Sequence, residues 1–185
     1  MSGVLYFDLE TQKYAEEVGG WKNAREMHIS VAVTYSEWEG LYRVYEESDV
    51  QALIEYLKSA EIVIGYNIDF FDLEVLKGYG DVANITTLDL LHDIERSLGF
   101  RIPLEKVAQA TLGRGKLATG ADAVQWFKEG EMYKLVEYCH QDVRITRDVC
   151  LYGVQHGYLW YPDVTSGNLH KISVQWHLPR GETSS

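Results

Sequence analysis

Three short acidic motifs, each beside an apolar segment, constrain most strongly what this chain can fold into. The first is Phe7-Asp8-Leu9-Glu10-Thr11, the second runs from Gly65 to Asp72, and the third is Tyr138-Cys139-His140-Gln141-Asp142. Carboxylates next to apolar segments tend to be drawn toward the core, where a charge needs a partner or a metal. A fold that brings the three motifs together would form an oxygen-rich pocket for two divalent metals.

The length and composition fit one domain, which we place at residues 1–178, with a disordered tail at 179–185. The chain has 185 residues, of which 46% are apolar, enough for a hydrophobic core. No apolar run approaches the ~20 residues of a membrane helix, and no secretory signal is visible at the N-terminus. Cys139 and Cys150 fall in one expected helix, roughly 16 Å apart and too far for a disulfide. We therefore expect a cytoplasmic protein with no membrane partner.

The net charge of −11 is unusual for a protein that binds nucleic acid, since phosphate binding normally requires lysine and arginine. The charge is uneven, because six cations and two anions give residues 96–128 a charge of +4. The basic loop Gly113-Arg114-Gly115-Lys116 lies in this window. We expect Arg114 and Lys116 to guide a phosphate backbone, and a solvated turn is the alternative. The acidic remainder favours weak non-specific binding, so a protein partner that supplies the substrate is a further expectation.

Apolar strands alternate with helical segments, which predicts a mixed α/β fold with a central sheet flanked by helices. The predicted strands are 4–8, 27–35, 41–45, 62–65 and 85–91, with weaker runs at 158–161 and 171–176. The second and third strands are expected to pair as a hairpin. The predicted helices are one after a capping box at 48–51, one after the strand 85–91, and 70–77, 103–113, 121–128 and 131–154. Ligands of such sheets bind at the carboxyl ends of strands, where we expect Asp8 and Asp72.

The first and second motifs each offer more than one interpretation. Asp8 and Glu10 are two residues apart in a strand, so their side chains face the same side, with Cα atoms about 6.6 Å apart. A solvated strand end is the alternative for this pair. Asp72 lies in the first turn of the helix that follows the strand 62–65. Asn67 and Asp69 are alternative site residues there, although an acid at Asp69 is also typical of a helix cap.

The third motif places Tyr138 and Asp142 four residues apart on one face of a helix. Apolar residues share that face, which predicts that it points inward and that Asp142 is paired or bound to a metal. For Tyr138 the alternative is simple packing, because the chain has 13 tyrosines.

Together and in this order, the three motifs resemble the DEDD superfamily of 3′–5′ exonucleases, which have a ribonuclease H-like fold. The resemblance covers Val4 to about Val154. The Tyr138-x-x-x-Asp142 spacing resembles the DEDDy branch, which includes ribonuclease D and the proofreading domains of family-B polymerases. The other branch has a histidine five residues before the last aspartate, and that position is Glu137 here.

The resemblance implies a two-metal exonuclease that hydrolyses phosphodiester bonds at single-stranded 3′ ends of DNA or RNA. Asp8 would bridge two Mg²⁺ or Mn²⁺ ions, Glu10 and Asp142 would complete the first metal site, and Asp72 would hold the second metal largely through water. Tyr138 would orient the attacking water. The expected substrate contacts are Leu9, Thr11, Asn67, Arg114 and Lys116.

Two alternatives stay open. One is a non-catalytic nucleic-acid or partner-binding module with the same fold, and the other is an endonuclease or a nuclease subunit of a larger repair assembly. Trp126, Trp160 and Trp176 would serve as a partner surface or as core residues.

Overall fold

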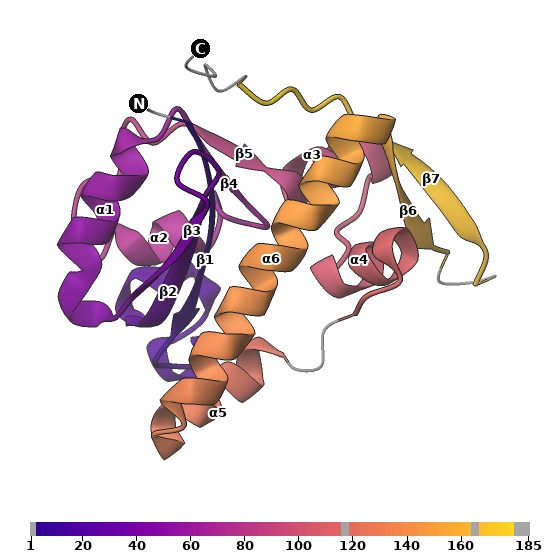
Figure 1. Cartoon of the computed structure of the whole chain (residues 1–185). Helices are drawn as coiled ribbons and strands as arrows, with labels where there is room; N and C mark the ends of the chain where they lie inside the picture. Colours follow the sequence, from indigo (N-terminus) through magenta and orange to yellow (C-terminus); the bar gives the residue numbers. More distant parts are fainter. Residues whose placement is uncertain (1–2, 116–118, 164–166, 180–185) are drawn as a thin grey trace, which may run out of the picture.

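A five-stranded mixed sheet forms the centre of the computed structural model, which describes residues 3–115, 119–163 and 167–179 (Figure 1). In spatial order, its strands are β3 (Leu41–Tyr45), β2 (Ile29–Ser36), β1 (Val4–Thr11), β4 (Ile62–Gly65) and β5 (Thr87–Asp89). β1 pairs antiparallel with β2 and parallel with β4. β2 and β3 form the predicted hairpin, and β4 runs parallel to β5. The predicted mixed sheet with β1 at its centre is thus confirmed.

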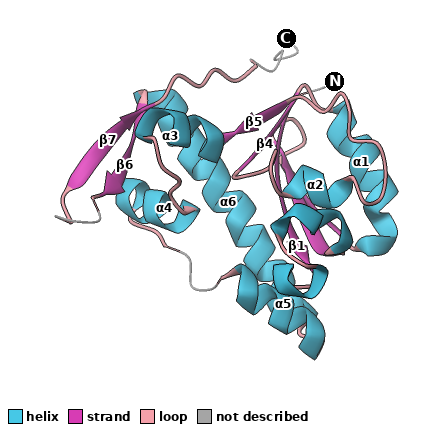
Figure 2. Cartoon of the chain, turned by 180° about the vertical axis from the view of Figure 1, so that it is seen from behind, coloured by secondary structure: helices cyan, strands magenta, loops and turns pink. Residues whose placement is uncertain are grey.

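The longest helix, α6, lies between this sheet and a separate two-stranded sheet, as both views show (Figures 1 and 2). The helices are α1 (Val50–Ser59), α2 (Asp72–Leu76), α3 (Leu90–Leu98), α4 (Leu104–Leu112), α5 (Gly120–Glu129) and α6 (Met132–His156). Short 3₁₀ helices occupy Ala15–Val18, Trp21–Glu26 and Glu47–Asp49, and the first two lie between the first two predicted strands, where no helix was predicted. The second sheet pairs β6 (Tyr158–Pro162) with β7 (Leu169–Ser173).

The side chains of β1 alternate between two hydrophobic cores, one on each face of the sheet. Leu5, Phe7 and Leu9 pack in one core with α1 and α2, and the even-numbered residues face the core that contains α4 and α6. The period of two therefore places Asp8 and Glu10 on the α6 face. The side chain of Leu9 is 2% exposed in the opposite core, so it offers almost no surface to a nucleotide.

Local boundaries around the acidic motifs differ from the sequence expectation. β1 continues to Thr11, so Asp8 lies inside the strand rather than at its end. Asp72 is the first residue of α2, which starts later than predicted. No side chain caps α1; the capping box lies two residues before the predicted one, with Glu46 as the N-cap of the preceding 3₁₀ helix and Asp49 as the third residue of that helix. Propensity alone does not fix the position of the capping box, because tertiary contacts decide where the helix starts.

Other expectations concern residues away from the sheet. Cys139 and Cys150 are both buried free thiols, as predicted. Within the described ranges, no helix combines the length and apolar character needed to cross a membrane. Lys116 and the predicted tail beyond Pro179 lie outside the described residues.

Candidate active site

The carboxylates of Asp8, Glu10 and Asp142 form one group on the α6 face of the sheet. One oxygen from each lies within 4.8 Å of the others. Asp8 is half-buried, whereas Glu10 and Asp142 are 8% and 3% exposed. β1 supplies the first two residues because positions two apart share a face. α6 supplies Asp142 because its inward stripe, which packs against β1 and β2, includes this position.

Asp72 is held near these carboxylates by a hydrogen bond from the backbone of β1. The parallel ladder between β1 and β4 ends at Tyr6, and the Leu9 N–H donates instead to Asp72 Oδ1 at 3.1 Å. The side chain of Asp72 is 3% exposed. It lies outside the group of three carboxylates, yet close enough to Asp8 for their charges to interact. The structure thus brings all four predicted acids to one region.

The electrostatics of this region favour a cation. Burial raises the pKa of Asp72 well above its usual range, and the charge of Asp8 raises it further. Burial likewise raises the pKa of Cys139, whose Sγ lies 3.4 Å from the Asp8 carbonyl oxygen, and the charge of Asp8 adds to that shift. Crowded carboxylates ionise together only when a positive charge offsets their repulsion. An all-oxygen donor set of this kind fits Mg²⁺ or Mn²⁺.

Tyr138 lies beside the carboxylates, one helical turn before Asp142. Its side chain is 6% exposed, and its ring meets Trp126 edge to face, with the centroids 5.9 Å apart. Burial raises the pKa of Tyr138 strongly, and the neighbouring charge of Asp142 and a hydrogen bond to it add to the shift. The hydroxyl therefore stays protonated at ordinary pH and can donate a hydrogen bond.

Asp89 has a structural role beside the site, and it was not among the site residues predicted from the sequence. It ends β5 and accepts hydrogen bonds from the backbone N–H groups of Asn67 at 2.9 Å, Asp69 at 3.2 Å, Leu91 at 3.0 Å and His92 at 3.3 Å. These bonds cap α3 and tie the turn before Asp72 to the sheet. The signal was present, because an aspartate between a strand and an apolar helix is a helix-start pattern.

Asn67 has a left-handed backbone, with φ of 73°, a conformation that asparagine tolerates better than most residues. Asp69 does not cap the next helix, which was the alternative interpretation of this residue. Phe71 occupies the N-cap position of α2 without a side-chain hydrogen bond, and Asp69 Oδ1 accepts from Thr87 Oγ1 at 2.7 Å. The turn in the second motif is therefore held by hydrogen bonds to Asp89 and Thr87, and these bonds fix the start of α2 at Asp72.

Two hollows flank the carboxylates and share Asn67. One, of about 370 Å³, is lined by Asp8, Tyr66, Asn67, Leu91, Arg101, Ile102, Pro103 and Leu104. The other, of about 410 Å³, includes Glu10, Thr11, Asn67, Phe71 and Gly120. Arg101 donates to Asn67 Oδ1 and also pairs with Glu95, so it is a cation at the edge of the site. Sequence reasoning counted Arg101 in the basic window but did not assign it to the site.

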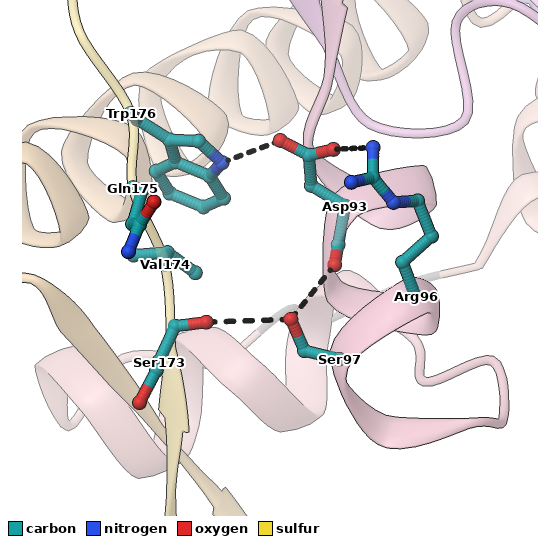
Figure 3. A pocket seen from close by; sticks show the side chains of 7 residues that line it. All are labelled: Asp93, Arg96, Ser97, Ser173, Val174, Gln175 and Trp176. Atoms are coloured by element: carbon teal, nitrogen blue, oxygen red, sulfur yellow. Dashed lines mark hydrogen bonds and ion pairs between the residues drawn. The ribbon is translucent and has the colours of Figure 1, made fainter.

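A third hollow, between α3 and the segment that follows β7, is separate from the carboxylates (Figure 3). Trp176 lies against Gly153, where an added Cβ would come within 2.5 Å of the indole. The Trp176 Nε1–H donates to Asp93 Oδ2 at 3.0 Å, and Asp93 also pairs with Arg96. The contacts of this hollow anchor the segment that follows β7, and Trp176 is a core residue.

A family model for the RNase H superfamily matches residues 5–152, a span that contains all four acids and Tyr138. The chain belongs to the RNase H superfamily. A comparison with curated proteins finds no match. The fold is RNase H-like, and membership together with the acidic group indicates a nuclease that acts on nucleic acid and uses divalent metal ions.

Asp72 makes the stability of the metal-free protein depend on pH. The pKa of Asp72 in the folded protein is raised above the unfolded value of ~3.9. Its contribution to the stability of the fold is therefore complete below that value, where the side chain is uncharged in both states, and is lost as pH rises through the folded pKa. Asp72→Asn should therefore gain stability relative to the wild type as pH rises above the unfolded pKa of ~3.9. Urea unfolding in EDTA measures the difference.

Asp122→Asn is the matched control with the opposite sign. Hydrogen bonds from Thr119 lower the pKa of Asp122, so its contribution is present above the unfolded pKa and is lost as pH falls. This variant should lose stability near neutral pH. A difference between Asp72→Asn and the wild type that does not change with pH would contradict the assignment.

Proposed function

We propose that this protein is a DEDDy-type 3′–5′ exonuclease that removes nucleotides from single-stranded ends with two Mg²⁺ or Mn²⁺ ions. The observation that carries the proposal is the group of Asp8, Glu10 and Asp142 oxygens within 4.8 Å, with Tyr138 beside it. Asp72, which accepts a hydrogen bond from the Leu9 N–H and interacts with the charge of Asp8, completes the set of four acids. A pure binding module has no need of four crowded acids, whose repulsion costs stability.

Each acid has a distinct role in this proposal. Asp8, Glu10 and Asp142 would hold one metal, and Asp8 with Asp72 would hold the second. Bound there, the metals would lower the pKa of the attacking water and offset the charge that develops on the leaving oxygen. Tyr138 would orient this water by hydrogen bonding, since its raised pKa makes the hydroxyl a poor base.

The two flanking hollows would accommodate the end of the strand. Thr11 and Phe71 line the hollow beside Glu10, together with the 69% exposed Trp21, which offers a ring to a base. Arg101 lines the hollow beside Asp8, where a guanidinium suits a phosphate. Asn67 lines both hollows. The carboxylates between the hollows would then face the last phosphodiester bond.

The proposal is tested with 5′-labelled single-stranded DNA and RNA in Mn²⁺, Mg²⁺ or EDTA. The expected result is a ladder of products that shortens from the 3′ end, depends on metal and is absent with Asp8→Ala. Covalently closed circular strands should stay intact. Cleavage of circles would assign the site to an endonuclease, and no cleavage of any strand with metal bound would contradict the proposal.

The basic loop after α4 is expected to contact the phosphate backbone. Arg114 Nη1 pairs with Asp148 on α6 at 3.0 Å, and its side chain is 59% exposed. Asp148 is six residues after Asp142, about 9 Å along the helix axis, which suits a phosphate upstream of the cleaved bond. Arg114→Ala with Lys116→Ala should weaken single-strand binding and reduce the salt slope of log K by ~1.4, or ~0.7 for each phosphate contact.

The control for the loop is Lys58→Ala on α1, which removes a cation from the opposite face of the sheet. Its affinity and salt slope should equal those of the wild type in the same titration. An unchanged slope in the loop variant would mean that residues 113–116 form only a solvated turn.

A further inference from the structure

The outer face of the β6–β7 pair carries aromatic rings and a lysine. In an antiparallel pair, directly opposed residues point to the same face. Leu159 opposes Ile172, and both are buried in the core at 0% and 1% exposure. Trp160 opposes Lys171, and Tyr158 is two residues from Trp160, so these three share the other face.

Rings from two elements form one connected cluster on this face. Tyr152 and His156, at the end of α6, have ring centroids 4.2 Å apart. Both contact Tyr158, which in turn contacts Trp160, with centroid separations of 5.6 to 6.0 Å. The Nζ atom of Lys171 lies 3.9 Å from the Tyr158 centroid and 5.1 Å from that of Trp160. We call this cluster the aromatic platform; its members are Tyr152, His156, Tyr158, Trp160 and Lys171.

The platform is fixed in position by α4. Thr111 Oγ1 accepts a hydrogen bond from the Trp160 N–H at 2.9 Å and donates to the Trp160 carbonyl at 3.1 Å. These bonds occupy the backbone of Trp160 and leave its ring half-buried on the outer face. A ring held in this way loses little conformational entropy when a ligand stacks on it.

One stripe of α6 joins the platform to the carboxylates. Residues three or four apart on a helix share a face, and this stripe contains Tyr138, Gln141, Ile145, Asp148, Tyr152 and His156. A hollow of about 380 Å³ lies on the stripe, lined by Arg114, Gln141, Arg144, Ile145 and Asp148. Figure 1 shows α6 running from α5 at one end to β6 and β7 at the other. Tyr138 and Tyr152 are about 21 Å apart along the axis.

The local charge permits a polyanion at the platform. Between Val149 and Pro179 the charged residues are Asp163 and Lys171, so this segment is formally neutral in a chain of net charge −11. Aromatic faces stack on bases of any sequence, and a cation above them can meet the phosphates between those bases. The family match ends at residue 152, so β6 and β7 lie beyond the segment that the superfamily model covers.

We propose that the aromatic platform is an accessory binding surface for single-stranded nucleic acid. This proposal rests on the proposed function, which sets the direction of the bound strand. The 3′ end would occupy the carboxylate site while upstream bases stack on Tyr158 and Trp160. A stacked strand rises ~3.4 Å per nucleotide, so 21 Å corresponds to about six nucleotides. A stacked strand shorter than this does not reach both places.

The test separates binding from cleavage. Fluorescence anisotropy in EDTA measures the affinity of the full chain for a 15-nucleotide oligothymidylate, and cleavage of a 4-nucleotide strand is measured in Mn²⁺. Trp160→Ala should weaken binding of the 15-mer about tenfold or more, since stacking contributes ~1–3 kcal/mol per base. Trp160→Phe should recover most of the affinity. Lys171→Gln, at an exposed position, should reduce the salt slope by ~0.7.

Cleavage of the 4-mer should be unchanged in all three variants, and Tyr133→Ala, at a 79% exposed ring near the other end of α6, should bind the 15-mer like the wild type. If the wild type cleaves both strands but Trp160→Ala and Lys171→Gln bind the 15-mer normally, the platform proposal fails alone. If binding depends on Trp160 but no strand is cleaved, the exonuclease proposal fails alone. Self-association lost in Trp160→Ala, with oligonucleotide binding unchanged, would assign the face to a second copy and overturn the platform proposal.

Discussion

Asp8→Asn is expected to lower metal-dependent cleavage by about a thousandfold or more. Asp8 is the residue common to the group of three carboxylates and to the interaction with Asp72, so its loss removes a ligand from both expected metal positions. Metal ions contribute several kcal/mol of charge stabilisation in such reactions, and ~4 kcal/mol corresponds to about a thousandfold in rate. Steady-state cleavage of a labelled oligonucleotide measures the effect.

The fold should tolerate this change, because an uncharged amide relieves repulsion among the carboxylates. The melting temperature without metal should therefore be equal to or higher than that of the wild type, while the stabilisation by Mn²⁺ should be lost. Asp81→Asn is the matched control, since it removes one charge at an exposed site where an amide oxygen can still accept from the Ala83 N–H. Wild-type activity in Asp8→Asn would exclude the carboxylate group as the catalytic centre.

Tyr138→Phe is expected to reduce kcat by about tenfold to a hundredfold with little change in KM. The substitution removes only the hydroxyl, so the edge-to-face contact with Trp126 is retained. A hydrogen bond to a charged group is worth ~1.5–3 kcal/mol, which corresponds to this range of rates. If the hydroxyl orients water in the reacting complex, as proposed, its loss should affect turnover rather than binding.

Metal binding distinguishes orientation from a structural role. Calorimetric titration with Mn²⁺ should give nearly the same affinity for Tyr138→Phe as for the wild type, since Tyr138 is not among the metal-binding carboxylates. Tyr133→Phe, on the same helix but 79% exposed, controls for loss of a tyrosine hydroxyl. A normal kcat in Tyr138→Phe, or equal losses of turnover and metal affinity, would contradict the proposed role.

The sequence predicted much of the fold because strong local patterns coincide with the elements that carry the site. The apolar run before Asp8 became the central strand, and the spacing of Tyr138 and Asp142 placed both on the inward stripe of α6. Period-two alternation also places Leu9 on the opposite face from Asp8, and the structure buries its side chain there, which does not support the expected substrate contact at Leu9. The sheet register follows from these buried faces.

Long-range contacts were not accessible to the same reasoning. The start of α2 at Asp72 depends on the Leu9 N–H and on the turn that Asp89 holds, and these residues are separated in sequence. Arg101 enters the site because α3 and α4 bring it beside Asp8 and Asn67. The aromatic platform depends on the pairing of β6 with β7, and the second of these strands begins two residues before its predicted position. Such contacts are set by tertiary packing rather than by local propensity.

The anomalous scattering of Mn²⁺ in crystals of the protein would locate the metal ions directly. We expect two manganese peaks, one beside Asp8, Glu10 and Asp142 and one beside Asp8 and Asp72, and both should be absent in Asp8→Asn. No peak at these carboxylates at saturating Mn²⁺, or peaks only elsewhere in the molecule, would contradict the claim that the three acidic motifs form one metal centre.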